Sequence, residues 1–361
     1  MLCSPMLRSP PTRIPTRLRE WLMAQPTGTA KQRRRPRRKA CLYAVGRIGD
    51  FVLMLSALCL ILTEYGPKNC TLIIAEATLP LAIREFPQAR LLCVPGESAS
   101  LLKGFLPLWW REREKLSADH YEQFFCLRHQ RDPYHEMIVS WIATDQLIKL
   151  ERATYPITAL PALCTELIAH QRVVEIALGH SINPAQILPQ FTTQPTRKDG
   201  RLLVYPLSRD SQRCLPITKT IAALRLWRNR SRAPIIFSGS LAEAQILAEY
   251  RQAAQQAKIE HVGLELPVSL SALVEQIAQA GVVLTVETAA VHIATALDKP
   301  TIAVLGGGIY GLCYPWRRSQ LQLPVHHHLP CFGCGWRCTE TEQFCLTQLT
   351  PAMIADALPA L

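Results

Sequence analysis

The sequence predicts a protein of the α/β class that is divided into two domains. Its 361 residues exceed one ordinary α/β core, and an apolar content of 48% is enough to build two. Strand and helix patterns alternate through both halves, which is typical of parallel βαβ units. A polar segment without periodicity, residues 189–200, separates the halves. We therefore expect one domain over residues 41–190 and a second over 199–361.

Short β-prone runs alternate with helical patterns in the first half. The predicted strands are residues 41–45, 71–75, 90–94 and 124–127. The predicted helices run from 51 to about 65 and then over 79–86, 134–150 and 161–180. The apolar run Phe51–Leu62 has 12 residues and is too short to span a bilayer, which needs about 20. It predicts a buried helix.

The same alternation restarts after the polar segment. The predicted strands are residues 202–205, 234–237, 282–286 and 301–305, and the predicted helices are 217–228, 241–256 and 269–280. Ligands of open α/β sheets bind beyond the carboxyl ends of the strands. Loops of both halves are therefore expected to face a cleft between the domains.

The net charge of +12 is concentrated in the first 40 residues, which hold eleven Lys and Arg and one acid, Glu20. The run KQRRRPRRK at 31–39 is typical of a solvated, disordered tail or of a mis-assigned start. Attraction to an anionic membrane is a second interpretation. Nucleic-acid binding is less favoured because interleaved aromatics and a second basic patch are missing.

The cell compartment is indicated by the lack of a secretory signal in these 40 residues and by thirteen cysteines. Cysteines without export indicate a reducing compartment, where disulfides are rare. We expect a cytoplasmic protein, with peripheral contact to the inner membrane face as an option offered by the basic tail.

The stretch Val283–Leu305 contains the densest group of candidate site residues. It predicts a buried strand, a polar turn, a helix containing His292 and a second strand that runs into Gly306, Gly307 and Gly308. The start of a helix presents free N–H groups and a positive dipole end, which attract phosphate. Glu287, Thr288 and Ala289 at that turn either bind a phosphorylated ligand or simply cap a helix.

Two further loops follow predicted strands. Asp50, after the first strand, is either a general base for an acceptor hydroxyl or the N-cap of the helix that begins at Phe51. Ser208, Arg209 and Arg213 follow the first strand of the second half and suit phosphate oxygens, although a solvated loop is equally compatible. The spaced glycines of a Walker loop or a dinucleotide fingerprint are missing.

A cysteine-rich segment, residues 326–345, begins with three histidines. Its cysteines, with two, three and six residues between them, are Cys331, Cys334, Cys338 and Cys345. Thiolates in a reduced protein suit zinc or iron, and four of them leave no open coordination position, so such a site is structural. A metal-free cysteine-rich lid is the alternative.

These motifs, in this order, resemble glycosyltransferase family 9, the heptosyltransferases of lipopolysaccharide core synthesis and of autotransporters. The matching residues are Arg47–Asp50, Ser208-Arg209 with Arg213, and Glu287–Ala289 with His292, followed by Ala296-Leu297 and Pro300. The resemblance covers about residues 41–355. It implies a GT-B fold, in which two Rossmann-like domains face a central cleft, and some relatives carry iron-binding C-terminal cysteines.

The resemblance also implies the activity. This is inverting transfer of a sugar from a nucleotide-sugar donor, typically ADP-heptose, with Asp50 as base and with Ser208, Arg213, Glu287–His292 and Gly306–Gly308 on the donor side. No catalytic metal or other cofactor is expected. Two departures leave the donor open: Glu-Thr-Ala replaces the usual Asp-Thr/Ser-Gly, and Gln212 replaces a common lysine.

The acceptor is not identified by the sequence. A cell-envelope glycan, a lipopolysaccharide core or lipid-linked sugar, and a protein are all compatible, and residues 96–135 with Trp109 and Trp110 are the expected acceptor region. A sugar-nucleotide epimerase and a catalytically silent nucleotide-sugar-binding protein are the alternative functions.

Overall fold

The computed structural model describes residues 39–94, 113–114, 116–128, 138–149, 164–192, 200–316 and 320–361. Residue contacts divide these into two units. The first comprises the described residues up to 149 together with 168–187, and the second comprises 164–167 and the described residues from 188 onward. The basic tail up to residue 38, Trp109, Trp110 and most of the predicted linker lie outside the described residues.

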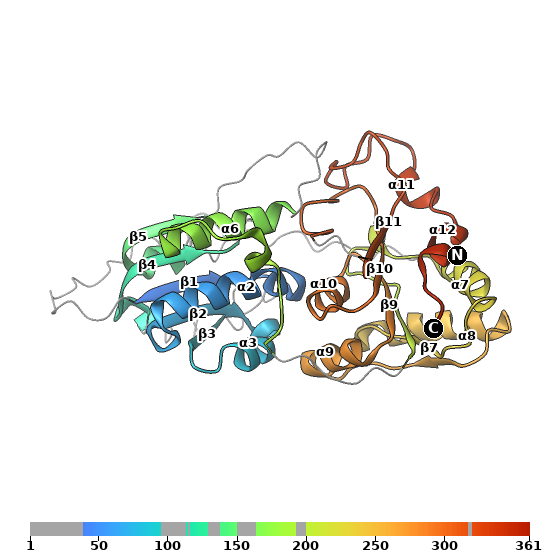
Figure 1. Cartoon of the computed structure of the whole chain (residues 1–361), viewed down its shortest axis with the longest axis horizontal. Coiled ribbons are helices and arrows are strands. Elements are labelled where there is room, and N and C mark those ends of the chain that lie inside the picture. Colours follow the sequence, from blue (N-terminus) through green and yellow to red (C-terminus); the bar gives the residue numbers. More distant parts are fainter. Residues whose placement is uncertain are drawn as a thin grey trace, which may run out of the picture. The chain divides into compact units, whose positions relative to one another are not determined.

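The first unit is built on a five-stranded parallel sheet in the order β3-β2-β1-β4-β5. The strands are β1 (Ala40–Ala44), β2 (Cys70–Ala75), β3 (Arg90–Val94), β4 (His120–Cys126) and β5 (Ala143–Lys149). The helices α2 (Ile48–Tyr65), α3 (Leu79–Glu85) and α6 (Thr165–Leu178) accompany them (Figure 1). Every residue of β1 and β2 is buried, which explains their continuous apolar sequence.

One predicted element of this unit is wrong. The pattern at 134–150 predicts a helix, but the chain is helical only at 138–141 and then forms β5, Ala143–Lys149. Parallel pairing with β4 decides the outcome, since it aligns Leu147 with Phe124 and Ile148 with Phe125. As an edge strand β5 exposes Asp145 and Gln146, so it lacks the long apolar run that marks a central strand.

Helix α2 is longer than the 12-residue apolar run from which it is predicted. Its 18 residues make it the one described helix long and apolar enough to cross a membrane. Most of it is buried, including Phe51, Leu55, Leu58 and Ile61. It therefore packs as a core helix, as expected.

The second unit is built on a six-stranded parallel sheet in the order β11-β10-β9-β6-β7-β8. The strands are β6 (Leu202–Tyr205), β7 (Ile235–Phe237), β8 (Val262–Leu264), β9 (Val282–Val286), β10 (Thr301–Val304) and β11 (Gln322–Val325). The helices are α7 (Ile217–Arg228), α8 (Ala244–Gln256), α9 (Leu270–Gln279), α10 (Ala289–Ala296), α11 (Phe344–Thr347) and α12 (Pro351–Ala357). Helices α9 and α10 cover one face, and α7, α8 and α12 cover the other (Figure 1).

Numbered from the first strand of this unit, the order is 3-2-1-4-5-6, the doubly wound arrangement of dinucleotide-binding sheets. Apolar side chains of the central strands, such as Val204 and Leu284, and of the helices, such as Leu224 and Trp227, form one core. The expected α/β class with two Rossmann-like sheets is thus confirmed.

Candidate functional site

The strand order of the second sheet reverses between β6 and β9. These strands pair in parallel from Leu202 beside Val282 to Tyr205 beside Thr285. Ligands of open α/β sheets bind beyond the carboxyl ends of strands at such a reversal. The predicted Ser208–Arg213 loop leaves β6 there, and the Glu287–Ala289 turn leaves β9 there.

The Ser208–Arg213 loop is fixed by contacts within itself. The backbone N–H of Ser208 donates to the sulfur of Cys214 over 3.3 Å, and the Cys214 thiol contacts the Ser208 carbonyl at 3.3 Å. The Asp210 carboxylate accepts the backbone N–H of Gln212 at 3.2 Å and begins a single helical turn, Ser211–Arg213. Cys214 was not a predicted site residue, and only contact in three dimensions reveals its role.

The two predicted loops meet at the backbone carbonyl of Glu287. The Ser208 hydroxyl donates to this oxygen at 3.4 Å, and a terminal guanidinium nitrogen of Arg213 donates to it at 3.4 Å. Arg209, in the same loop, is exposed to solvent. The structure therefore brings Ser208, Arg213 and Glu287 together and leaves Arg209 at the surface.

The side chain of Glu287 is buried without a partner. The residue is 4% exposed, and neither carboxylate oxygen has a hydrogen-bond partner among the described residues. Burial raises the pKa of Glu287 to about 8, although Arg213 lowers it in part and Asp210 raises it further. At neutral pH this carboxyl group is mainly protonated and uncharged.

Two polar atoms of the Ser208–Arg213 loop are also buried and unpaired within the described part of the chain. They are Oε1 of Gln212 and Nε of Arg213. An unpaired buried donor or acceptor costs about 1–3 kcal/mol, so a group of them at one place marks a position where a ligand supplies the missing partners.

Helix α10 begins at the same place. Thr288 is its N-cap in extended conformation, but its side chain makes no capping hydrogen bond, and Ala289 is the first helical residue. Most backbone N–H groups of a first helical turn have no partner within the helix. Since α10 begins two residues after Glu287, these groups lie close to it in the chain, and a helix start of this kind suits an anionic oxygen.

His292 lies one turn into α10 and is 6% exposed. Its Nδ1 accepts the indole N–H of Trp316 at 3.2 Å, and its ring packs edge-on against Tyr314 with centroids 5.9 Å apart. Burial lowers the pKa of His292 to about 3, with a smaller contribution from Arg213, so the ring is neutral. These contacts are those of a buried polar residue that has partners within the protein. The sequence left this interpretation of His292 open beside a role in ligand binding.

The predicted glycines follow β10 and lie under aromatic rings of the cysteine-rich segment. A Cβ atom on Gly306 or Gly308 would come within 2.5 Å of the Trp336 ring, and one on Gly307 would come within 2.3 Å of Phe332. The backbone N–H of Gly333 donates to the Gly307 carbonyl at 2.8 Å. The three glycines thus allow the cysteine-rich segment to pack closely against the edge of the sheet. Their spacing in the sequence did not reveal this packing role.

The four predicted metal ligands lie around one small cavity beside Gly307: Cys331, Cys334, Cys338 and Cys345. All four are free thiols. Burial and the neighbouring thiols raise the pKa of Cys338. No group of three or more His, Cys, Asp or Glu side chains is arranged to hold a metal ion in the described ranges.

Asp50 lies in the first unit, at the reversal between β1 and β4 in that sheet. The helix begins at Ile48 rather than at Phe51, so Asp50 is its third residue and not its N-cap. The Asp50 carboxylate accepts the backbone N–H of Arg47 at 3.0 Å and remains half-buried. A Cβ on Gly46 would come within 2.9 Å of the Asp50 Cβ, so Gly46 allows the close approach of the turn.

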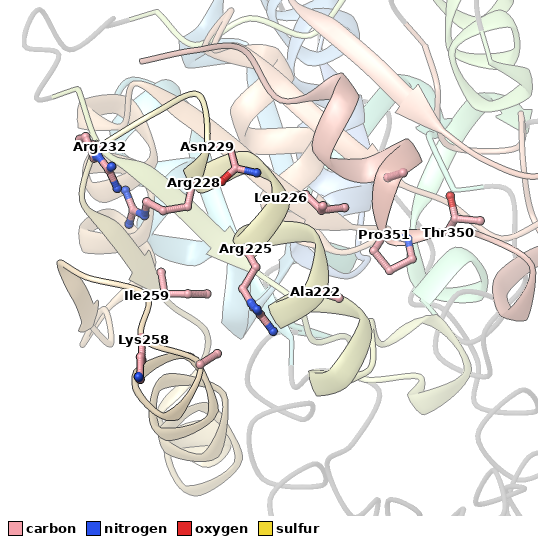
Figure 2. A pocket seen from close by; sticks show the side chains of 12 residues that line it. Ala222, Arg225, Leu226, Arg228, Asn229, Arg232, Lys258, Ile259, Thr350 and Pro351 are labelled. Atoms are coloured by element: carbon pink, nitrogen blue, oxygen red, sulfur yellow. The ribbon is translucent and has the colours of Figure 1, made fainter.

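A groove of about 630 Å³ lies elsewhere in the second unit (Figure 2). It is lined by the ends of α7 and α8 and the start of α12, at the edge where the strands begin. Its buried arginine, Arg228, donates to the carbonyls of Ser231, Ala233 and Glu260 and so closes the end of α7. None of the predicted site residues lines this groove.

Comparisons with known proteins agree on one family. The model of glycosyltransferase family 9 (heptosyltransferase) matches residues 180–339. The structure resembles the Escherichia coli heptosyltransferase WaaC with ADP, at 16% identity and a TM-score of 0.62 over 79% of this chain and 92% of that one. It also resembles a family 9 glycosyltransferase of Veillonella parvula, at 12% identity and a TM-score of 0.66 over 91% and 98%.

A third solved structure has the same fold. The E. coli ADP-heptose lipopolysaccharide heptosyltransferase II is 14% identical, with a TM-score of 0.61 over 88% of this chain and 97% of that one. No curated protein matches the chain significantly. The resemblance to glycosyltransferase family 9 is confirmed over residues 180–339, and the likeness to these solved structures confirms a fold of the GT-B type.

Proposed function

We propose that the protein is a glycosyltransferase that catalyses inverting transfer of a sugar from a nucleotide-sugar donor, heptose from ADP-heptose, to a hydroxyl group of a cell-envelope acceptor. The observation that carries the proposal is the group of unpaired polar atoms around Glu287 and Arg213 at the strand-order reversal. Two solved structures of the same fold are described with ADP and with ADP-2-deoxy-2-fluoro heptose. This supports a nucleoside diphosphate sugar as the donor.

The diphosphate binds at the start of α10 in this proposal. The hydroxyl of Ser208 and the guanidinium of Arg213 offset the charge that develops on the leaving diphosphate, and because they are held in advance they need little reorganisation. Glu287 is compatible with an anion because its carboxyl group is mainly neutral at pH 7. A neutral carboxyl can also donate a hydrogen bond to a donor oxygen.

Asp50 is the proposed base. Direct displacement at the sugar carbon requires removal of a proton from the acceptor hydroxyl, and a half-buried carboxylate at a turn is suited to this step. Its hydrogen bond from the Arg47 N–H orients the carboxylate at the turn. The reaction then inverts the configuration at the sugar carbon and needs no cofactor.

Calorimetric titration with ADP-heptose, ADP, GDP-mannose and UDP-glucose tests the donor side. We expect ADP and ADP-heptose to bind, and ADP-heptose to be hydrolysed slowly without an acceptor. Failure of every nucleotide to bind contradicts the proposal. Binding without hydrolysis or transfer to any acceptor favours a silent binding protein, and exchange of donor isomers without an acceptor favours an epimerase.

Three classes of acceptor are compatible with this activity: a lipopolysaccharide core or lipid-linked sugar, another cell-envelope glycan, and a protein. Each is offered to the enzyme with labelled ADP-heptose. Label in the lipid extract, in the glycan fraction or in precipitated protein then identifies the class. The inverting stereochemistry is tested by the anomeric configuration of the product.

A structural zinc or iron ion at Cys331, Cys334, Cys338 and Cys345 is part of the proposal. Support comes from the position of all four around one cavity and from a chemistry that suits these metals. Metal analysis of the protein purified without a histidine tag is expected to give about one ion per chain. A stoichiometry near zero contradicts the site and favours a metal-free lid.

We further propose a cytoplasmic enzyme whose basic first 40 residues attract it to the anionic inner face of the membrane. Co-sedimentation with vesicles that contain phosphatidylglycerol is expected for the full chain and is lost at high salt. A chain that begins at residue 39 should no longer sediment. Sedimentation with neutral phosphatidylcholine vesicles contradicts the electrostatic explanation. Binding to nucleic acid is not expected.

A further inference from the structure

Trp336 of the cysteine-rich segment has an unusual backbone conformation. Its φ is +63°, and the preceding Gly335 has the same value. The backbone N–H of Arg337 donates to the Cys334 carbonyl at 3.1 Å, so these four residues form a tight turn with two left-handed central positions. Glycine adopts this conformation freely, but a bulky residue is strained in it, so surrounding contacts must hold Trp336 there.

The contacts that hold Trp336 come from the candidate site. Its six-membered ring lies against Gly306 and Gly308, where any side chain would collide with it. The Gly335 N–H donates to the Gly308 carbonyl at 2.8 Å and fixes the turn to the glycines. The guanidinium carbon of Arg213 lies 5.9 Å from the ring centroid, within the range of a cation–π contact.

Trp336 also carries an unused donor. Its indole N–H is buried and has no hydrogen-bond partner in the residues that the structure describes. Tryptophan normally finds a partner when its N–H is buried. A strained backbone, an unpaired donor and a contact with Arg213 coincide in this one residue. Packing alone explains neither the unpaired donor nor the contact with Arg213.

We propose that Trp336 is a positioning residue for the nucleotide diphosphate, and that its indole ring holds the Arg213 guanidinium at the carboxyl end of β6. The inference rests on the proposed function, because it assigns Arg213 to a diphosphate. The long side chain of Arg213 is held otherwise only by long contacts, at 3.4 Å to the Glu287 carbonyl and at 3.8 Å to the Asp210 carboxylate. The ring face restricts that side chain and lowers the entropy lost on binding.

The cysteine-rich segment therefore forms one wall of the donor site, through Trp336. This explains why three consecutive glycines follow β10: two of them leave room for the Trp336 ring. It also explains why a strained turn is retained within a run of cysteines, since the turn aims the ring at Arg213.

The test is ADP binding to purified full-length protein by calorimetry. Trp336→Leu removes the ring face and is expected to weaken ADP binding about three- to thirtyfold. Trp336→Phe keeps a ring face and is expected to retain most of the affinity. In an Arg213→Gln background, Trp336→Leu should add less than about a twofold loss, because the residue that it positions is gone. Arg337→Ala, an exposed neighbour in the same turn, is the matched control and should bind ADP normally.

Circular dichroism establishes that each variant is folded. Should Trp336→Leu fail to fold, the difference in tryptophan emission between wild type and Trp336→Phe on addition of ADP is the second measurement, and a difference is expected. The inference is overturned if Trp336→Leu loses the same factor with and without Arg213, or if ADP leaves that emission difference unchanged. Wild-type protein that binds no nucleotide contradicts the proposed function itself, whereas normal ADP binding by Trp336→Leu overturns only the role of Trp336.

Discussion

The turns at the strand-order reversal of each unit differ in how their polar groups are satisfied. Both lie where the strand order reverses, between β1 and β4 in one sheet and between β6 and β9 in the other. In the first unit the Asp50 carboxylate is half-buried and accepts the Arg47 N–H. In the second unit Glu287, Gln212 and Arg213 have buried atoms without partners among the described residues.

Because of this difference, the two turns suit different chemical roles although both lie at a reversal of strand order. Unpaired buried atoms cost free energy until a ligand pairs with them, so the second unit is suited to hold a large polar ligand. A half-buried carboxylate that the Arg47 N–H orients at a turn is the kind of group that acts as a general base, so the first unit is suited to supply one. The contrast supports our proposal that the second unit binds the donor and that the first unit supplies the base.

The strongest test of the contrast is Asp50→Asn. The amide oxygen can still accept the Arg47 N–H, so the start of α2 should be preserved, but the group cannot take a proton. We expect transfer to fall by about 10²- to 10⁴-fold while the Kd for ADP changes less than about twofold. Release of ADP from ADP-heptose in the presence of acceptor measures the rate. Near-normal turnover would show that Asp50 is not the base.

Arg213→Gln is expected to have the next largest effect, on the other side of the contrast. Loss of a charged hydrogen-bond donor to the diphosphate should weaken ADP binding by about 10- to 100-fold. Arg225→Gln, an exposed arginine of the same unit in the groove of Figure 2, is the matched control. Equal losses in both variants would indicate a general effect of positive charge rather than a site at Arg213.

The fold was largely predictable because the sequence of each central helix and strand indicates its own secondary structure. The helix at Ile217–Arg228 and the strand at Val282–Val286 have the predicted bounds, since both have unambiguous periodicity or continuous apolar sequence. The edge strand β5 was not predictable in the same way. Its two faces are unequally exposed, and only pairing with β4 selects the extended form.

The candidate site was predictable where residues share a loop and not where they meet across the fold. Ser208, Arg213 and Glu287 follow strands that the sequence placed correctly, so the reversal of strand order brings them together. Trp316 and Trp336 come from later loops without periodicity. Their contacts with His292 and with the glycines after β10 depend on chain path, which spacing does not reveal.

The burial of Glu287 predicts a pH effect on stability of intermediate size. Its pKa is about 8 in the folded protein and near 4.5 in the unfolded chain, so between these values the folded state retains a proton that the unfolded state has lost. The free energy of unfolding therefore falls as pH rises and levels off above pH 8. His292, with a folded pKa of about 3, gives the opposite slope, but only below its ordinary value of 6.5.

The window from pH 6.5 to 8 thus isolates Glu287 from His292. Urea unfolding of the wild type should lose about 2 kcal/mol across this window, and Glu287→Gln should lose much less, because an amide does not titrate. ADP binding by the wild type should also weaken above pH 8, when a buried carboxylate faces the diphosphate. If the free energy of unfolding of both proteins changed equally with pH, Glu287 would be ionised across this window. It would then no longer distinguish the second unit from the first.

Gly46→Ala should have the smallest effect and bears on the first unit alone. The new Cβ would lie 2.9 Å from the Asp50 Cβ and 3.3 Å from its Oδ2, so the carboxylate must move by a few tenths of an ångström. Displacement of a base from its acceptor slows proton transfer, and we expect kcat to fall about three- to tenfold. The Kd for ADP should not change, because Gly46 lies in the first unit and the proposed donor loops lie in the second. A change in Kd with kcat intact would mean that the turn after β1 takes part in donor binding, and the division of roles between the two turns would then have to be redrawn.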